Sequence, residues 1–550
     1  VIASYVETFG TPTEKAVAHF HEWMTAAGGL YLRKHAPYIA TVFTTHATVM
    51  GRCIAGNRLP LYNDLPKFNA DELARQFNVT AKHSIEKMAA AYHDAFLTVS
   101  DITANECKYL LGREPDGVTP NGFENDFVWA GEEYYAKRDE ARRAMISVAE
   151  ACLGEKFTGD PLIVGTSGRY EFRNKGIDVF IESLKQLAAS DRLRREVLAY
   201  ITVPAGNRGP RLDLQAHLAD PSKPIDAGQY RHSTHYLENA TWDPIVNALK
   251  NSNLTDPGSK VKVIFVPTYL NKADGIFHKD YYELLVGMDI TVFPSYYEPW
   301  GYTPLESVAF SIPTVTTTLA GFGIWVDKQR EHAGVEVIRR DDYNDKEVEA
   351  KIADTLLRFS LLDEKHVNEQ HTSAYEISLT ALWEHLFAAY EQAYSEAVES
   401  SIVRTNRAVL DGGTKTEQIN FVRQQLFVEK PVWNRMMVDK TLPKRLHALE
   451  ELSRNLWWCW NPGARDLFEG IDPALWAESD RNPIAFLDKM SVERMKELEK
   501  DTNFLAQLDA VHTQFRDYMN EKPDPKATTV SYFSMEYGLH ASLKIYSGGL

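Results

Sequence analysis

Short apolar runs separated by amphipathic segments dominate the chain before about residue 340. Apolar runs without polar alternation predict parallel strands that are buried on both faces. We assign such strands to Ile39–Phe43, Phe96–Val99, Leu162–Thr166, Tyr200–Pro204, Val261–Val266, Ile290–Phe293 and Thr314–Leu319. Because these strands alternate with helical patterns, the chain is predicted to have an α/β fold with parallel sheets.

Helical periodicity fills most of the remaining sequence. It covers residues 13–35, 70–95, 131–153 and 345–400, and no strand is predicted before Ile39. In the last helix, about residues 375–398, one face carries Leu379, Leu382, Trp383, Leu386, Phe387 and Tyr390. We expect this apolar face to pack back across two α/β units.

Composition and charge narrow the class of protein. The chain has 550 residues, 44% of them hydrophobic and 25% charged, which is typical of a soluble globular protein of about three domains. A formal net charge of −16 argues against nucleic acid or an anionic membrane as a partner. The four cysteines, Cys53, Cys107, Cys152 and Cys459, lack metal-ligand spacing and favour buried thiols in a reducing compartment such as the cytoplasm.

The stretch 290–323 concentrates the candidate chemistry. After its first strand comes a polar loop containing Glu298, and Thr303 then has the pattern of a helix N-cap followed by Pro304 and Glu306. This order places the loop at the carboxyl end of a parallel sheet, where ligands bind in open α/β folds. Amides at the helix start favour a phosphate. Thr303 and Glu306 also match an ordinary capping box, and Glu298 also fits a solvated loop acid.

The sequence SYYEPWGYTPLE at 295–306 resembles the signature of glycogen synthases of the animal and fungal type, which are retaining glycosyltransferases with a GT-B fold. FTTHATVMGR at 43–52, TPNG at 119–122 and GRYEFRNKG at 168–176 resemble further segments of this family. The resemblance covers roughly residues 1–400. It implies two Rossmann-like units facing a cleft, and transfer of glucose from UDP-glucose to the non-reducing end of an α-1,4-glucan with retention.

The resemblance also implies roles for the matching residues. Glu298 would contact the donor glucose and His46 would lie beside its ring, so these are the candidate catalytic residues. The implied substrate-binding residues are Arg52, Arg169 and Lys175 at the phosphates, Tyr281 on uracil, Glu306 at the ribose, and Gly301, Tyr302 and Thr303 at the helix start.

Taken without the resemblance, each of these residues has an ordinary structural interpretation. A lone histidine at a strand end is more often structural, a basic loop is more often solvated, and Tyr281 fits an ordinary core aromatic residue. Arg173 replaces a serine of the family motif and receives no role. We identify neither a side-chain nucleophile nor an acidic metal cluster, so no metal or cofactor is expected for the synthase part.

The C-terminal part has a different character. Residues 401–443 are polar, with Gly412–Gly413, Pro431 and Pro443, and are predicted to be a linker. The tryptophan-rich segment from Leu446 has helical spacing, which favours a core over a sugar-binding surface. Together with VSYFSMEYGLHASLKIYSGGL it resembles the N-terminal part of bacterial-type α-glucan phosphorylases. That resemblance implies a mostly helical start of a phosphorylase module that uses pyridoxal phosphate, with the cofactor lysine beyond Leu550.

These observations divide the chain into five segments. They are an N-terminal Rossmann-like unit (1–155), a nucleotide-sugar-binding Rossmann-like unit (156–345), C-terminal helices (346–400), the linker (401–443) and the phosphorylase start (444–550). Because the chain begins at Val1 in sequence typical of mid-domain and stops in a glycine-rich turn, we expect a piece of a longer polypeptide, incomplete in its first and last units.

The expected partners are UDP-glucose or ADP-glucose and an α-glucan, with a homo-oligomer left open. Two alternatives stay open as well. One is another retaining GT-B glycosyltransferase of the sucrose or trehalose type, and the other is a non-catalytic glucan-binding segment.

Overall fold

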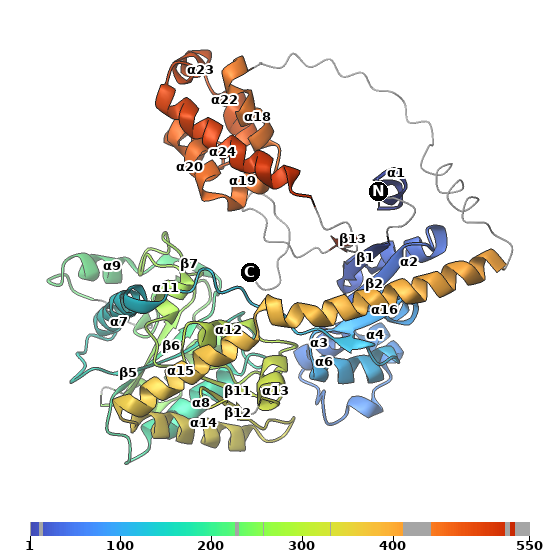
Figure 1. Ribbon diagram of the computed structural model, residues 1–550. Coiled ribbons are helices and arrows are strands. Elements are labelled where there is room, and N and C mark those ends of the chain that lie inside the picture. The colour runs from blue at the N-terminus through green and yellow to red at the C-terminus, as the bar shows by residue number, and fades with distance from the viewer. Residues whose placement is uncertain are drawn as a thin grey trace. The chain divides into compact units, whose positions relative to one another are not determined.

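The computed structural model describes residues 2–9, 15–225, 230–256, 258–329, 332–410, 442–522 and 529–533. The chain divides into two compact units. The large unit is His19–Asn406, and the small unit combines Val1–Ala18 with Arg407–Leu550. The large unit in turn contains two α/β subdomains, which Figure 1 shows in blue and in cyan to yellow.

The first subdomain is built on a sheet in which β1 (Ala16–His21), β2 (Ala40–Thr45), β3 (Ala95–Thr98) and β4 (Gly117–Val118) lie side by side in that order. The pairs β2–β3 and β3–β4 are parallel. The surrounding helices are α2 (Glu22–His35), α3 (Val49–Gly56), α4 (Ala70–Gln76), α5 (Thr80–Tyr92) and α6 (Asp101–Glu106), with short turns at Leu65–Lys67 and Cys107–Leu111.

Two sequence expectations for this subdomain are wrong. Residues 13–35 are not one helix, because strand β1 precedes α2 and lies beside β2. The buried His19 is satisfied in the sheet by a 2.7 Å hydrogen bond between its Nε2 and Thr44 Oγ1, which lets a polar residue occupy an internal strand. Residues 70–95 also split into α4 and α5, at Asn78, whose φ of 57° is left-handed.

The second subdomain has a six-stranded sheet in the order β12-β11-β10-β5-β6-β9. Its printed pairings are all parallel. In chain order the strands are β5 (Leu162–Ser167), β6 (Val197–Thr202), β9 (Val261–Val266), β10 (Ile290–Val292), β11 (Thr314–Thr317) and β12 (Val335–Ile338). The direction of strand succession therefore reverses between β5 and β10, as in doubly wound folds.

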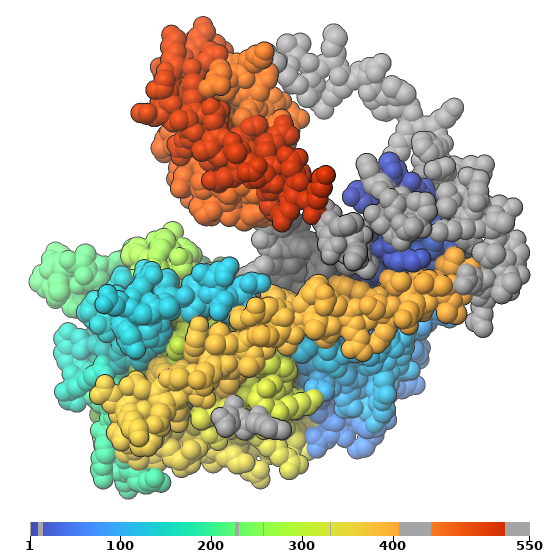
Figure 2. Space-filling view, viewed as in Figure 1, coloured from blue at the N-terminus to red at the C-terminus, as the bar shows by residue number. Residues whose placement is uncertain are grey.

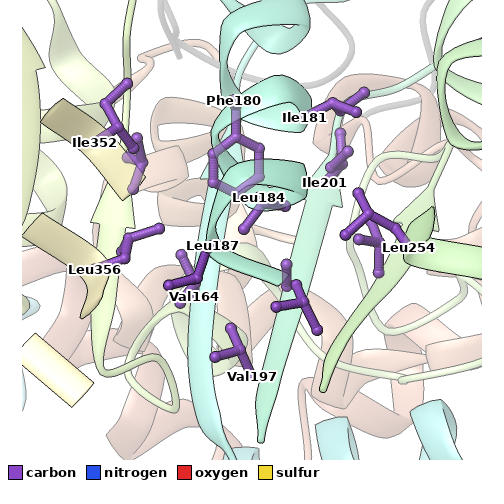
Figure 3. Packing of buried hydrophobic residues seen from close by; sticks show 14 of the residues in the cluster. Val164, Phe180, Ile181, Leu184, Leu187, Val197, Ile201, Leu254, Ile352 and Leu356 are labelled. Atoms are coloured by element: carbon purple, nitrogen blue, oxygen red, sulfur yellow. The ribbon is translucent and has the colours of Figure 1, made fainter. Parts of the chain in front are cut away.

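Helices cover both faces of this sheet, so alternate residues of each central strand are buried on opposite sides. One face, with Val164, Val197 and Ile201, packs on α8 (Ile177–Ala188) and α14 (Asp345–Ser360), as Figure 3 shows. The other face packs on α7 (Gly131–Leu153) and α11 (Tyr281–Leu285). Burial on both faces explains the continuous apolar runs in the sequence.

Helix α7 thus belongs with the second sheet, although residue 155 was the expected boundary. Its Ala141 and Met145 share a buried cluster with Tyr200 and Leu284. The boundary between the subdomains therefore lies before α7, because the apolar face of this helix is buried by the sheet that follows it.

The segment 205–260 contains an antiparallel pair of β7 (Asn207–Pro210) and β8 (His235–Leu237). It also contains α9 (Leu212–Ala219), α10 (Pro244–Lys250) and a short turn at Asn253–Thr255. Two further helices, α12 (Tyr302–Ala309) and α13 (Gly321–Asp327), connect the last strands of the sheet.

The C-terminal helices of the large unit pack across both subdomains, as expected. α15 (Glu364–Thr380) contacts α12, and α16 (Trp383–Leu410) reaches the first subdomain, where Arg404 Nη2 lies 2.6 Å from Asp94 Oδ2. Figure 2 shows these helices as one yellow-to-orange surface. α16 continues into the segment expected to be a linker, and residues 411–441 lie outside the described residues.

The single helix expected at 375–398 is instead interrupted between α15 and α16. At this break the Phe123 amide donates to Ala381 O over 3.0 Å, and the Trp383 amide donates to Phe123 O over 3.3 Å. Phe123, directly after the TPNG turn, therefore forms hydrogen bonds with the Ala381 carbonyl and the Trp383 amide, which would bond within the helix if it were continuous.

The small unit is mostly helical in its described part. Its elements are α1 (Ile2–Phe9), a turn at Lys444–Leu446, α18 (His447–Ser453), α19 (Trp457–Trp460), α20 (Pro462–Ile471), α21 (Pro473–Glu478), α22 (Pro483–Lys489), α23 (Val492–Leu498), α24 (Thr502–Asn520) and β13 (Thr529–Phe533). Trp457, Trp458 and Trp476 are buried in its core, as the helical spacing predicts, and Trp460 is exposed. The glycine-rich end of the chain lies outside the described residues.

All four thiols are free; the predicted burial is confirmed for Cys107, Cys152 and Cys459, whereas Cys53 is half-buried. Among the described helices, none has the length and apolar character needed to cross a membrane.

Gly176, the N-cap of α8, allows the loops after β5 and β10 to approach each other closely. Its φ is 68°, and a Cβ built there would lie 1.8 Å from the carbonyl oxygen of Pro294. Gly154 at the end of α7 has the same φ of 68°, but a Cβ there would meet nothing within 4 Å. The two glycines thus share a backbone conformation and differ only in their surroundings.

We predict that Gly176→Ala destabilises the large unit more than Gly154→Ala does. Both variants carry the left-handed strain of about 1–2 kcal/mol, and Gly176→Ala adds a collision of about 1–3 kcal/mol. Calorimetric melting of the full chain measures the difference. Equal losses in melting temperature would mean that the loops after β5 and β10 are not packed together in solution.

Candidate functional site

The candidate site lies where strands β5 and β10 end. These strands are neighbours at the point where strand order reverses, which is the usual ligand-binding position in doubly wound sheets. The loop after β5, residues 168–176, is GRYEFRNKG, and the loop after β10, residues 293–301, carries Glu298. The amides of Tyr296 and Tyr297 donate to Asn174 O over 2.8 and 3.1 Å, so the two loops are joined.

Lys175 and Glu298 form an ion pair across these loops, with exposed fractions of 12% and 13% for their side chains. The Ser295 hydroxyl lies 3.5 Å from Glu298 Oε2 and donates to it. Arg169, on the same loop as Lys175, is more exposed and lies 3.3 Å from Glu171. The structure thus brings together Lys175, which is expected at the phosphates, and Glu298, which is expected at the glucose.

The start of α12 differs from the sequence prediction. Gly301, with a φ of 114°, is the N-cap and the helix begins at Tyr302. Thr303 therefore lies inside the first turn, where its carbonyl accepts a 3.0 Å hydrogen bond from Ser307 Oγ. The predicted cap at Thr303 is wrong, because the left-handed turn at the glycine starts the helix two residues earlier.

Glu306 is consequently not part of a capping box, and its side chain faces Tyr282 instead. The Tyr282 hydroxyl donates to Glu306 Oε1 over 2.9 Å. Burial raises the pKa of Glu306 to about 7, against the opposing effects of Tyr282 and of the charge on Lys175. This carboxyl group therefore exchanges its proton near neutral pH, which is common in functional sites.

Tyr281 lies at the same edge of the sheet, because Asp280 and Glu283 form a capping box that fixes the start of α11. The Tyr281 hydroxyl is 2.7 Å from Ser167 Oγ, at the end of β5. Burial raises the pKa of Tyr281 well above its ordinary value. Sequence reasoning missed Ser167 and Tyr282; the adjacent tyrosines were the available signal for the latter.

His46 follows β2 in the first subdomain, and its contacts involve the end of β1. Its backbone amide donates to Glu22 Oε1 over 2.9 Å, and its Nε2 lies 2.8 Å from His21 Nδ1. Burial lowers the pKa of His46 to about 4, so the imidazole is neutral at pH 7. Glu22 has a φ of 65°, which is rare for a residue other than glycine.

Sequence reasoning misses Glu22 and His21 because the helical pattern of residues 13–35 predicts one helix there. The signal was present in the buried run that ends at His21, which resembles the run that ends just before His46.

Arg52 is exposed on α3 and lies near the boundary between the subdomains. Burial raises the pKa of Glu106 to about 7 and that of Tyr297 well above its ordinary value, and the charge of Arg52 lowers both. Tyr297 precedes Glu298, and its hydroxyl lies 3.5 Å from Glu106 Oε2. Arg52 is therefore close to the loop that carries Glu298.

The described residues contain no group of three or more His, Cys, Asp or Glu side chains placed to hold a metal ion.

Comparison with known proteins gives two family matches. The model of a family described as "Glycogen synthase" matches residues 1–213 and 231–452. A second model, described as "Protein of unknown function (DUF3417)", matches residues 442–543. The C-terminal match therefore does not by itself identify a phosphorylase module.

Among similar proteins, the glycogen [starch] synthase of Neurospora crassa is 32% identical over 386 residues, which cover 59% of this chain and 54% of that protein. Isoform 2 from Saccharomyces cerevisiae is 29% identical over 490 residues, 72% of this chain and 68% of that protein. The chain thus spans about half the length of the Neurospora protein.

One similar solved structure is the catalytic domain of Starch Synthase IV from Arabidopsis thaliana bound to ADP and acarbose. The alignment covers 72% of this chain and 76% of that chain, with 14% sequence identity and a TM-score of 0.43. The family match extends over both α/β subdomains and the C-terminal helices of the large unit. The chain belongs to the glycogen synthase family.

Proposed function

We propose that the large unit transfers glucose from UDP-glucose to the 4-hydroxyl group at the non-reducing end of an α-1,4-glucan, with retention of the anomeric configuration. The observation that carries this proposal is the Lys175–Glu298 pair at the reversal of strand order. A cation for a phosphate and a carboxylate for sugar hydroxyls lie in contact there, beside the start of α12.

In this proposal the donor replaces the contact between Lys175 and Glu298. Each side chain is mostly buried, and the pairing compensates both charges. A nucleotide sugar offers a partner to each, with the β-phosphate for Lys175 and glucose hydroxyls for Glu298. Binding then exchanges one set of charged hydrogen bonds for another.

Departure of UDP develops negative charge on the β-phosphate, which cationic groups and helix amides can stabilise electrostatically. We assign this role to Lys175, Arg169 and Arg52, together with the amides at Gly301, Tyr302 and Thr303. Stabilisation of developing charge by preorganised donors is usually the largest single contribution to catalysis.

The remaining residues would hold the rest of the donor. Glu306 would accept hydrogen bonds from the ribose hydroxyls, and Tyr281 would stack on the uracil. His46, neutral because its pKa is about 4, would offer a hydrogen bond rather than a charge to the glucose. We assign no side-chain nucleophile, metal or cofactor to this part.

We further propose that residues 444–550 are the N-terminal part of an α-glucan phosphorylase module that binds pyridoxal phosphate through a lysine beyond Leu550. The resemblance of the segments from Leu446 onward supports this. Phosphate-dependent release of glucose 1-phosphate from glycogen by the parent polypeptide would test it, and the absence of such release in a pyridoxal-phosphate-loaded preparation would contradict it.

Incubating the chain with UDP-glucose carrying a radiolabelled glucose, together with glycogen, tests the transferase proposal. Label that enters glycogen and is released by an enzyme specific for α-1,4 linkages supports it. Transfer to fructose 6-phosphate or glucose 6-phosphate instead would favour a sucrose-type or trehalose-type enzyme. Parallel assays with ADP-glucose identify the preferred donor.

We predict that Lys175→Met lowers transfer by more than about 10²-fold, because it removes a donor to the developing charge. It should also destabilise the large unit, by up to about 3 kcal/mol, since it leaves Glu298 buried without its partner. The double variant Lys175→Met with Glu298→Gln should regain that stability and stay inactive.

Lys185→Met is the matched control, since Lys185 lies on α8 and pairs with Glu182 away from both loops. Turnover assays and calorimetry measure both effects. Wild-type turnover in Lys175→Met would show that this lysine is not part of the site.

We predict that UDP affinity of the wild type rises about tenfold from pH 6 to pH 8 relative to Glu306→Gln. With a pKa of about 7, roughly one Glu306 in ten is ionised at pH 6 and nine in ten at pH 8, and the ionised form accepts both ribose hydroxyls. The variant serves as reference because it removes this titration and leaves that of the UDP phosphate.

The same pKa shift has a consequence for stability. Folding raises the pKa of Glu306 from 4.5 to about 7. Glu306 therefore adds to the free energy of unfolding below pH 4.5, and this contribution is lost as the pH rises through 7. Glu306→Gln should lack this loss of stability.

Calorimetry measures the UDP affinity of the wild type and of Glu306→Gln across this pH range. If both proteins show the same pH dependence, Glu306 is not part of the binding site.

A further inference from the structure

One buried carboxylate, that of Asp342, joins the two α/β subdomains. Asp342 follows β12 in the second subdomain and is 7% exposed. Its Oδ2 accepts a 2.6 Å hydrogen bond from the backbone amide of Asn63, and its Oδ1 lies 3.4 Å from the amide of Tyr62. The amide of Asp342 donates in return to Asn63 Oδ1 over 3.3 Å.

Tyr296 completes this contact from the loop that carries Glu298. Its side chain is almost fully buried and its hydroxyl donates to Asp342 Oδ1. The same hydroxyl accepts a 3.0 Å hydrogen bond from the amide of Leu61 and lies 3.3 Å from the carbonyl oxygen of Leu59. A phenol two residues from Glu298 is thus fixed to the segment 59–63 of the first subdomain.

Two guanidinium groups hold the ring of Tyr296. Arg173 lies 5.2 Å and Arg340 lies 5.7 Å from the ring centroid, within the range of cation–π attraction. Arg340 also donates to the carbonyl oxygen of Pro294, at the start of the same loop. Arg173, which stands where the family motif has serine, belongs to the loop of Lys175. Both loops of the site therefore meet at this tyrosine.

We propose that Asp342, Tyr296 and Arg173 are positioning residues that set the loop of Glu298 against the first subdomain. The proposal rests on the proposed function, because it explains how the two halves of a donor site reach one geometry. We call the hydrogen bonds of Asp342 and Tyr296 to residues 59–63 the inter-subdomain latch.

The physical basis is the cost of opening the latch. Separation of the subdomains would remove two amides of the first subdomain from a buried carboxylate, and an amide from a buried phenol. The latch thereby couples His46 and Arg52 on one side to Lys175 and Glu298 on the other. Catalysis tolerates only displacements well below about 1 Å in the positions of the reacting groups. Glucose transfer therefore requires that the two subdomains keep a fixed relative position.

The experiment compares Asp342→Asn and Tyr296→Phe with Asp341→Asn. Asp341 is the matched control, because its carboxylate accepts a hydrogen bond from the Tyr343 amide within its own turn. Hydrogen exchange of the amides of Leu61, Tyr62 and Asn63 reports the latch without any reference to activity. The turnover number, the KM for UDP-glucose and the Kd for UDP report its effect on the site.

Exchange at these three amides should speed up about tenfold or more in Asp342→Asn and stay at the wild-type rate in Asp341→Asn. The turnover number should fall at least tenfold in Asp342→Asn and Tyr296→Phe. The Kd for UDP should change less than about threefold, since Arg169, Lys175, Tyr281 and Glu306 belong to the second subdomain and Arg52 is the only side chain assigned to UDP that belongs to the first. Arg173→Ser should act in the same direction and more weakly.

Unchanged exchange in Asp342→Asn would overturn the latch, whatever the activity. Faster exchange with an unchanged turnover number would show that the latch exists and does not position the site. If the wild type transfers no glucose from any nucleotide sugar, the proposed function fails, and the exchange measurement still decides whether the latch holds the subdomains.

Discussion

The contact between Lys175 and Glu298 depends on a single topological constraint, the adjacency of β5 and β10 in the sheet. These strands lie far apart in sequence, and only the reversal of strand order makes their carboxyl ends neighbours. Gly176 and Gly301 then supply the left-handed N-caps from which α8 and α12 start. Everything else in the candidate site is arranged around this edge.

The electrostatics of the site follow from burial. His46 is kept neutral, whereas Glu306 and Glu106 have pKa values raised to about 7, in each case because burial disfavours the charged form. Lys175 and Glu298 lie in contact as an ion pair. A nucleotide sugar would therefore meet a site with few uncompensated charges, in which binding replaces internal hydrogen bonds instead of desolvating isolated ions.

The sequence predicts five of the six strands of the second sheet, because these strands are buried on both faces and are bounded by polar loops, and it misses β12, in which Glu336 is exposed. Val261–Val266 matches β9, and the loops after β5 and β10 lie together as expected. The sequence does not predict strand β1, because His19 and His21 are polar residues in a buried strand. The hydrogen bond of His19 to the distant Thr44, which makes this burial possible, cannot be read from the sequence. Local capping rules likewise favoured Thr303 over Gly301.

The contacts between the subdomains were beyond sequence reasoning for the same reason. Asp342 and Asn63 are widely separated along the chain, and neither lies in a recognisable motif. In the sequence, Arg173 differs from the family pattern but shows no sign of a role. Its position over the Tyr296 ring depends on the tertiary fold. Residues that act through long-range contacts leave little periodic or local signal.

A crystal structure of the full chain with UDP-glucose bound tests the central claim most directly, because it measures the contact between Lys175 and Glu298. The account predicts that Lys175 Nζ leaves the carboxylate and lies about 3 Å from an oxygen of the β-phosphate, with Glu298 turned towards hydroxyl groups of the glucose. A bound donor with the Lys175–Glu298 pair intact would contradict the account.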